Sequence, residues 1–196
     1  MKSDINMPIA NLYDKNIFCL EGDWETDLRK KSSVQSALQL LEANLEINTI
    51  YKTCSTYEEF CNRLHILTSD NRIYAKYSII YLAFHGRKNK IQIGEKDYSL
   101  DHIGNEFTGL LDNKIVHFGS CKTLFIDEKK AKEFLNKTGA LALSGYAKNI
   151  DFISSTVFDI LYFEMCQNYL EIEAIERNML KNYKELCEVL EFKIYY

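Results

Sequence analysis

Short apolar runs alternate with segments of helical periodicity along most of this 196-residue chain. The run S-I-I-Y-L-A-F at residues 78–84 is almost continuously apolar and rich in β-forming residues. Such a run is typical of a central strand that is buried on both faces. Residues 34–45 instead carry apolar side chains three and four positions apart, which predicts an amphipathic helix. The chain therefore combines buried strands with helices that pack through one face.

The same patterns assign an element to most of the remaining chain. Predicted strands lie at residues 16–21, 49–54, 78–84, 114–120, 140–144 and 192–196, with a small hairpin at 90–93 and 97–100. Predicted helices lie at residues 34–45, 56–67, 100–111, 127–136 and 152–190, the last interrupted near 169–172. Because strand and helix alternate at least four times, we expect an α/β fold with a mostly parallel central sheet and helices on both faces. The length fits a single domain over residues 1–196.

Composition narrows the class of partner. Hydrophobic residues make up 46% of the chain and charged residues 27%, which is ordinary for a chain that folds around a core. The net charge of −4 gives no basic excess for nucleic acid, and no run of about 18 apolar residues predicts a membrane span. Residues 1–10 lack the apolar stretch of a signal peptide, so we expect a cytoplasmic protein. Its six cysteines are then expected to be buried thiols, metal ligands or a nucleophile rather than disulfides.

Two of the central strand candidates end in residues that carry chemistry. His85-Gly86 follows one strand, and Cys121 follows another. The carboxyl ends of parallel strands lie on one edge of a sheet, so these residues are expected to meet although 121 − 85 = 36 positions separate them. An imidazole beside a thiol is the usual means of producing a thiolate nucleophile near neutral pH. We therefore predict a dyad of His85 and Cys121, with the N–H groups of Gly86 and Cys121 as an oxyanion hole.

Other roles for these residue types stay open. A buried strand often ends in a Cys or a His for structural reasons alone. His117 lies about 13 Å from Cys121 along the same strand at a rise of about 3.3 Å per residue, so we expect it to be a packed histidine. Cys61 and His65 share one helical face and could bind zinc with Cys54, but a structural zinc site needs four ligands. We therefore expect no metal site.

The residues around the two strand ends resemble the caspase-like (clan CD) cysteine peptidases, which include caspases, metacaspases and the bacterial CHAT domains. The resemblance is carried by Y-L-A-F-H-G at residues 81–86 and H-F-G-S-C-K-T at residues 117–123, and residues 120–123 are nearest to the CHAT type. The order of elements over residues 16–146 matches a whole caspase-type core. The caspase signature Gln-Ala-Cys is absent, and the gap of 36 positions is shorter than the roughly 50 of caspases.

The resemblance implies a three-layer fold of the caspase-like type and the activity of a cysteine endopeptidase. Cys121 would attack the scissile carbonyl, and His85 would act as general base and then as general acid. The resemblance also implies a protein or peptide substrate and no cofactor. It is compatible with a regulatory protein partner. Bacterial members of this kind often serve in regulated proteolysis, including defence.

By the same resemblance, three places form the pocket for the residue before the scissile bond, called P1. They are the loop after the first strand, the position before the nucleophile, and the loop after the strand that follows the nucleophile. The residues at these places are Glu21, Asp23, Gly119, Ser144, Tyr146 and Asp151. Acids occupy two of the three places, and a desolvated carboxylate favours a cation, so we expect cleavage after Lys or Arg. The alternative is that Asp23 and Asp151 cap the helices that follow them.

Two further functions fit the same sequence. One is a catalytically inactive member of this fold that binds a partner. The other is an unrelated α/β binding domain of the flavodoxin or receiver type, which for a receiver requires an acid at the phosphoacceptor strand end. His85 and Cys121 stand at two such ends here. No phosphate-binding glycine motif and no G-x-S-x-G motif is present, so nucleotide binding and serine hydrolysis lack support.

Overall fold

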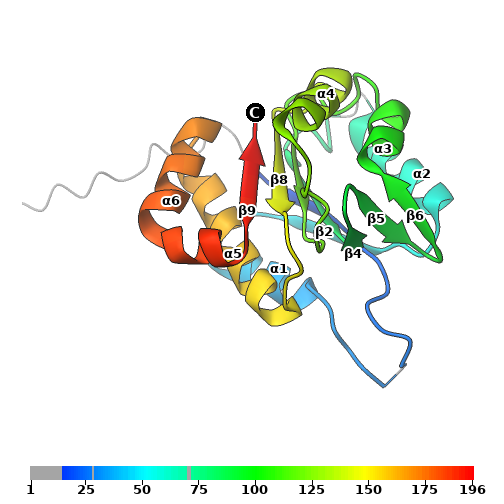
Figure 1. The fold of residues 1–196 in the computed structure, drawn as a ribbon, viewed down its shortest axis with the longest axis horizontal. Helices are drawn as coiled ribbons and strands as arrows, with labels where there is room; N and C mark the ends of the chain where they lie inside the picture. Colours follow the sequence, from blue (N-terminus) through cyan, green and yellow to red (C-terminus); the bar gives the residue numbers. More distant parts are fainter. Residues whose placement is uncertain (1–14, 28, 70–71) are drawn as a thin grey trace, which may run out of the picture.

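The apolar runs form a six-stranded central sheet in the computed structural model, which describes residues 15–27, 29–69 and 72–196 (Figure 1). The strands are β1 (Ile17–Glu21), β2 (Thr49–Thr53), β3 (Ile79–Ala83), β7 (Ile115–Phe118), β8 (Ala142–Tyr146) and β9 (Phe192–Tyr195). They lie in the order β2-β1-β3-β7-β8-β9, in which the first five are parallel and β9 is antiparallel to β8. The predicted mostly parallel sheet is confirmed. The signal-peptide expectation for residues 1–10 lies outside the described residues.

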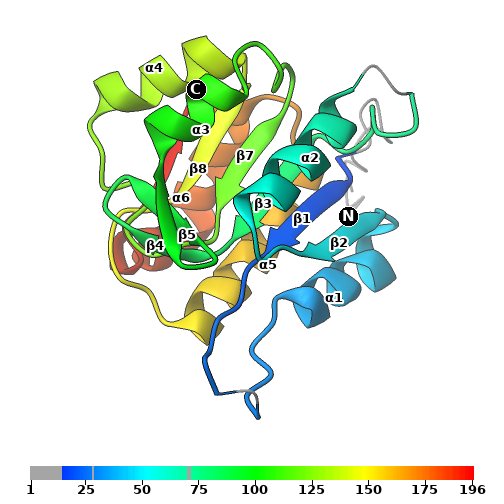
Figure 2. The same ribbon diagram turned by 90° about the vertical axis from the view of Figure 1, so that its right-hand side faces the viewer.

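Helices cover both faces of this sheet and complete three layers (Figure 2). One face is covered by α1 (Gln35–Leu45), α5 (Phe152–Asn168) and α6 (Ile172–Val189). The other face is covered by α2 (Tyr57–Thr68), α3 (Leu100–Glu106) and α4 (Glu128–Thr138). The predicted α/β class and the predicted break between the last two helices are therefore confirmed. None of the helices in the described ranges combines the length and apolar character needed to cross a membrane.

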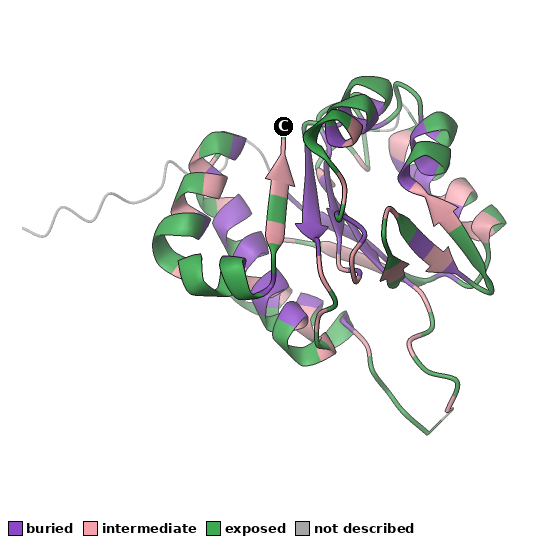
Figure 3. Ribbon diagram, in the orientation of Figure 1, coloured by how far each residue is buried: buried purple, intermediate pink, exposed green. Residues whose placement is uncertain are grey.

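Neighbouring residues of each central strand point into different cores, because side chains alternate along a strand. In β3, Ile80 and Leu82 join the core on the side of α2, α3 and α4, whereas Ile79 and Tyr81 join the core on the side of α1, α5 and α6. Every residue of β1, β3 and β8 is buried, and Figure 3 shows this as a buried centre between the helical layers. The continuous apolar runs thus come from strands that pack on both faces, as the sequence predicts.

Side-chain caps fix the starts of two helices. The hydroxyl oxygen of Thr56 accepts the N–H of Glu59 at 3.1 Å, and the Glu59 carboxylate accepts the N–H of Ser55 at 3.1 Å. The carboxylate of Asp127 accepts the N–H of Lys130 at 2.8 Å. These bonds satisfy amide groups that the first turn of a helix leaves without a partner.

Several predicted boundaries differ from the structure, and two of these elements differ near a glycine. α3 ends at Glu106 rather than near residue 111, and the chain then passes through Gly109, whose φ of 67° is left-handed. β8 begins at Ala142 and continues to Tyr146, instead of ending before Gly145. A glycine usually ends a strand prediction, but Gly145 pairs in register with Phe118 of β7 and carries the sheet further.

A second sheet of three antiparallel strands follows β3 directly. It contains β4 (His85–Arg87), β5 (Lys90–Ile93) and β6 (Lys96–Ser99). The predicted hairpin of β5 and β6 is confirmed. β4 was not predicted, because three residues of the sequence His-Gly-Arg carry no strand pattern. Since β4 begins right after the buried Phe84, the chain leaves the central sheet at His85.

Replacing Gly145 by Ala tests how closely β7 and β8 approach each other. A Cβ at Gly145, where φ is 151°, would lie 2.6 Å from the carbonyl oxygen of Phe118. We expect Gly145→Ala to lower the free energy of unfolding by about 3 kcal/mol, because backbone strain and overpacking cost roughly 1–3 kcal/mol each. Gly109→Ala is the control, since its φ is 67° and no atom lies within 4 Å of the added Cβ. Equal losses for the two variants in urea denaturation would contradict this packing argument.

Candidate active site

The loops that follow β1, β3 and β7 meet at the carboxyl edge of the central sheet. β1 lies between β2 and β3, so the chain changes its direction of winding there, and open α/β sheets bind ligands at such a point. Each of the three loops contributes a residue to one pocket of about 150 Å³, namely Trp24, His85 and Cys121. The pocket is also lined by Val34, Tyr81, Phe84, Gly119, Ile150, Phe152, Ser155 and Thr156. The two residues of the predicted dyad are therefore brought into one pocket.

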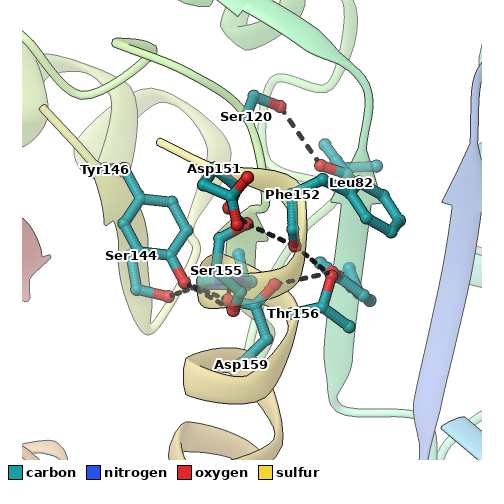
Figure 4. Close-up of polar contacts among 11 residues, drawn as sticks. Leu82, Ser120, Ser144, Tyr146, Asp151, Phe152, Ser155, Thr156 and Asp159 are labelled. Carbon is teal, nitrogen blue, oxygen red and sulfur yellow. Dashed lines mark hydrogen bonds and ion pairs between the residues drawn. The ribbon is translucent and has the colours of Figure 1, made fainter. Parts of the chain in front are cut away.

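Gly86 allows the chain after β3 to lie directly against the chain after β7. A Cβ at Gly86 would lie 2.4 Å from the carbonyl oxygen of Cys121 and 2.5 Å from Oγ1 of Thr123. No side chain fits in that space, so only glycine permits this approach. A further link is the hydroxyl of Ser120, which donates to the carbonyl of Leu82 at 3.4 Å (Figure 4). The two strand ends therefore lie directly against each other.

Cys121 presents a partly exposed thiol with a defined backbone environment. Its Sγ accepts the N–H of Ile150 at 3.4 Å and donates to the Ile150 carbonyl at 3.6 Å. The next residue, Lys122, has a left-handed φ of 54°, a conformation that costs a non-glycine residue about 1–2 kcal/mol. Lys122 donates its N–H to the carbonyl of Lys148 at 2.9 Å, whereas no backbone carbonyl of the described chain accepts the N–H of Cys121. Strain of this kind is concentrated at functional sites.

The ring of His85 is oriented by Trp24. Its Nε2 lies 2.8 Å from the carbonyl oxygen of Trp24. A carbonyl oxygen can only accept, so Nε2 carries the proton and donates it. The neutral ring then has its lone pair on Nδ1, which is the atom able to take up a proton. The rings of Trp24 and His85 also meet edge to face at 5.3 Å, and Trp24 meets Phe152 at 5.1 Å.

The remaining cysteines are poor candidates for a nucleophile. Burial raises the pKa of the thiols of Cys19, Cys54, Cys61, Cys166 and Cys187. The pKa of Cys54 rises to about 11 and that of Cys166 to about 12, so these residues stay protonated at neutral pH. Apart from Cys121, only Cys61 is partly exposed among the six cysteines, all of which lie in the described ranges. A reactive thiolate is the nucleophilic form, so these five thiols are unsuited to catalysis.

Glu21, the last residue of β1, is buried and anchors the loop that follows it. One carboxylate oxygen accepts the N–H of Val34 at 2.8 Å and the indole N–H of Trp24. The other accepts the hydroxyl of Ser33 at 2.6 Å and the hydroxyl of Tyr51. Burial and the hydrogen bond to Glu21 raise the pKa of Tyr51 to about 12, which keeps this tyrosine a donor. With four donors bound, Glu21 positions Trp24 and Val34 in the pocket wall and has no acceptor site left for a ligand.

Other residues predicted for the P1 pocket lie in different environments. Gly119 lines the pocket. Asp23 is exposed in the loop after β1. Asp151 caps α5, where its carboxylate accepts the N–H of Ser154 at 3.0 Å, and this bonding lowers the pKa of Asp151. The helix-capping alternative therefore describes Asp151, and neither aspartate is part of the pocket lining.

Ser144 and Tyr146 belong to a buried polar cluster behind the pocket, part of which Figure 4 shows. Asp159 of α5 is its centre and accepts the hydroxyl of Tyr81 at 2.6 Å and the hydroxyl of Tyr146. The Nε2–H of His117 donates to Asp159 at 2.8 Å, and its Nδ1 accepts the hydroxyl of Ser144 at 3.0 Å. His117 is thus a packed, fully bonded histidine, as the strand spacing predicts. Neither Ser144 nor Tyr146 lines the pocket.

The buried cluster supports the pocket through Tyr81. A Cβ at Gly119 would lie 2.6 Å from the ring of Tyr81, so this glycine lets the chain before Cys121 pack directly on the ring. Burial and the charge of Asp159 raise the pKa of Tyr81 well above its usual value, which keeps the tyrosine a donor to Asp159. Asp159 therefore holds the ring of Tyr81 in place, and the chain just before Cys121 packs on that ring.

The role of Asp159 was not predicted from the sequence. Its signal was a lone acid within V-F-D-I-L-Y-F at residues 157–163, an otherwise apolar helical stretch. An acidic side chain in such a position is buried only when donors surround it. Those donors come from β3, β7 and β8, and their meeting at α5 depends on the packing of α5 on the sheet.

The zinc alternative concerned the helical face of Cys61 and His65. In the structure, Nε2 of His65 lies 3.1 Å from a carboxylate oxygen of Glu106 on α3. Across the ranges that the structure describes, no three His, Cys, Asp or Glu side chains are grouped so that they could hold a metal ion.

Asp159→Ala removes the acceptor that Tyr81, Tyr146 and His117 share. We expect the free energy of unfolding to fall by at least about 3 kcal/mol, because three buried donors lose their partner. Asp151→Ala, at the exposed start of the same helix, is the matched control and is expected to cost only the smaller energy of one helix cap. Urea denaturation measures both variants. A loss for Asp159→Ala no greater than that for Asp151→Ala would contradict a supporting role for the cluster.

Comparison with known proteins assigns the chain to a family. The model of DUF6642, described as a family of unknown function, matches residues 14–196. No curated protein matches the sequence. The family match includes every strand of the central sheet and both residues of the predicted dyad. The chain therefore belongs to DUF6642, a family of unknown function.

Proposed function

We propose that this protein is a cysteine endopeptidase, with Cys121 as the nucleophile and His85 as the general base and acid. The observation that carries the proposal is the convergence of the two residues in one pocket, with Gly86 packed against Cys121. The proposal follows the resemblance to caspase-like and CHAT-domain peptidases. It also assigns the three-layer α/β fold to the caspase-like type.

In the first half of the proposed reaction, His85 takes the thiol proton of Cys121 on Nδ1, and the thiolate attacks the carbonyl carbon of the scissile bond. The carbonyl oxygen becomes an oxyanion that accepts hydrogen bonds from the N–H groups of Gly86 and Cys121. When the C–N bond breaks, His85 gives its proton to the leaving amine. The acyl group remains on Sγ.

In the second half, His85 takes a proton from water, and the resulting hydroxide attacks the acyl carbon. The C–S bond breaks, Cys121 regains the proton from His85, and a carboxylic acid leaves. The steps need no metal or cofactor. Throughout, the carbonyl of Trp24 accepts the Nε2–H of His85, so the ring keeps Nδ1 as its acceptor in both halves. An acceptor of this kind orients the catalytic base in other hydrolases.

The strand order raises the alternative of a doubly wound binding domain. Flavodoxin-like sheets share the order in which the first strand lies between the second and the third, so the order alone does not decide function. A receiver domain also requires an accessible acid at a strand end. The acid that ends β1, Glu21, is bound by four donors, and the ends of β3 and β7 carry His85 and Cys121. This arrangement favours thiol chemistry over phosphate transfer.

The proposed enzyme acts on proteins or peptides in the cytoplasm, under the control of a regulatory protein, as in bacterial defence. This part of the proposal rests on the resemblance. A catalytically inactive member of the same fold, which only binds a partner, is the competing function. Covalent labelling separates the two, because only the enzyme activates its thiol.

A mixture of peptidyl acyloxymethyl ketones with apolar, cationic and acidic P1 residues provides the test. We expect the mixture to modify Cys121 of the unaltered protein, which tryptic mass spectrometry locates. Cys121→Ala is expected to abolish this labelling. His85→Ala is expected to slow it by at least about 100-fold, because general base catalysis contributes about 10²–10⁴ in rate.

Cys61→Ala and His65→Ala are the matched controls, since they remove the same residue types from α2, outside the pocket. Both are expected to label at the unaltered rate. Labelling that survives Cys121→Ala would exclude the proposed nucleophile. A folded protein that no probe in the mixture labels would favour the binding function instead.

A further inference from the structure

The pocket that contains Cys121 has a chemical character that differs from the one expected from the sequence. We infer that it receives an uncharged apolar P1 side chain of about the size of leucine, rather than lysine or arginine. This inference deepens the proposed function and rests on it. It is carried by the lining of the pocket, the bonding of the nearby acids and the volume available.

No carboxylate lines the pocket among the residues that the structure describes. One predicted acid, Glu21, is buried and already binds four donors, two of which belong to the wall residues Trp24 and Val34. Asp151 is engaged by the N–H and the hydroxyl of Ser154 at 3.0 and 3.1 Å. A P1 cation in this pocket would therefore lose water without gaining a counter-charge.

The polar groups of the pocket wall are likewise engaged. Ser155 donates its hydroxyl proton to the carbonyl of Asp151 at 2.9 Å, and Thr156 donates to the carbonyl of Phe152 at 2.7 Å (Figure 4). Both bonds lie within the first turns of α5 and turn the hydroxyl protons away from a ligand. The wall thus offers mainly methyl, methylene and ring surface to a bound side chain.

The volume of the pocket suits an occupant of moderate size. Its volume is about 150 Å³. Apolar cavities of about this volume in other proteins take up a benzene molecule. Rings of Trp24, Tyr81, Phe84 and Phe152 surround the space, and such rings favour aliphatic or aromatic side chains. A leucine side chain matches both the volume and the surface.

Three acyloxymethyl ketones with one peptide scaffold and P1 Leu, Arg or Asp test the inference. The second-order rate constant for modification of Cys121 is measured by mass spectrometry for each. We expect the Leu probe to react at least about 100-fold faster than the Arg or Asp probe, because a buried charge without a partner is strongly disfavoured.

A designed acid provides the second arm. Thr156→Asp adds a carboxylate to the pocket wall and is expected to raise the rate of the Arg probe relative to the Leu probe by at least about 10-fold. Val157→Asp is the matched control, because Val157 is the next residue of α5, is 52% exposed and does not line the pocket. It is expected to leave the ratio unchanged. If circular dichroism shows that Thr156→Asp fails to fold, the inference is tested by the unaltered protein alone, through the ratio of its rate constants for the Leu, Arg and Asp probes.

The outcomes separate this inference from the proposed function. An Arg or Asp probe that modifies Cys121 as fast as the Leu probe would overturn the inference about P1. It would not contradict the proposed endopeptidase function. Failure of all three probes, in a sample whose Cys121 is alkylated by iodoacetamide, would overturn both. Equal changes in the ratio for Thr156→Asp and Val157→Asp would overturn the assignment of the P1 pocket.

Discussion

The backbone of Gly86 lies against the segment Ser120–Thr123 more closely than any side chain would allow. β3 and β7 are adjacent parallel strands, so their carboxyl ends emerge side by side and bring the two segments into range. The absence of a Cβ at Gly86 then closes the remaining gap. A sheet topology and one glycine thus suffice to place His85 and Cys121 in the same pocket. Without this contact, His85 and Cys121 would lie on two loops that do not touch.

Two buried carboxylates shape the pocket without entering it. Glu21 binds Trp24 and Val34, and thereby holds the loop after β1 over the sheet. Asp159 binds Tyr81, the ring against which Gly119 packs. Each carboxylate is compensated by several donors, as a buried charge requires. Both carboxylates therefore bind donors of the protein itself, and the surface that remains for a substrate is apolar. This explains how a chain with acids near the site can form an uncharged pocket.

The sequence predicted the central strands well, because their apolar runs reflect burial on both faces. It also pointed to His85 and Cys121, since strand ends in a parallel sheet converge. It did not predict β4, whose three residues carry no pattern, or the role of Asp159, whose partners lie on three distant strands. The sequence also placed acids in the P1 pocket that do not line it in the structure. Their orientation and their bonding partners depend on tertiary packing, which residue type and spacing do not encode.

His85 and Cys121 are proposed to act as one catalytic unit. The most direct measurement is the rate constant for iodoacetamide alkylation of Cys121 at neutral pH, in the unaltered protein, in His85→Gln and in the control His65→Gln. Because His85 is proposed to take the thiol proton, we expect His85→Gln to be alkylated at least about 10-fold more slowly and the control at the unaltered rate. Equal rates for the unaltered protein and His85→Gln would contradict the dyad.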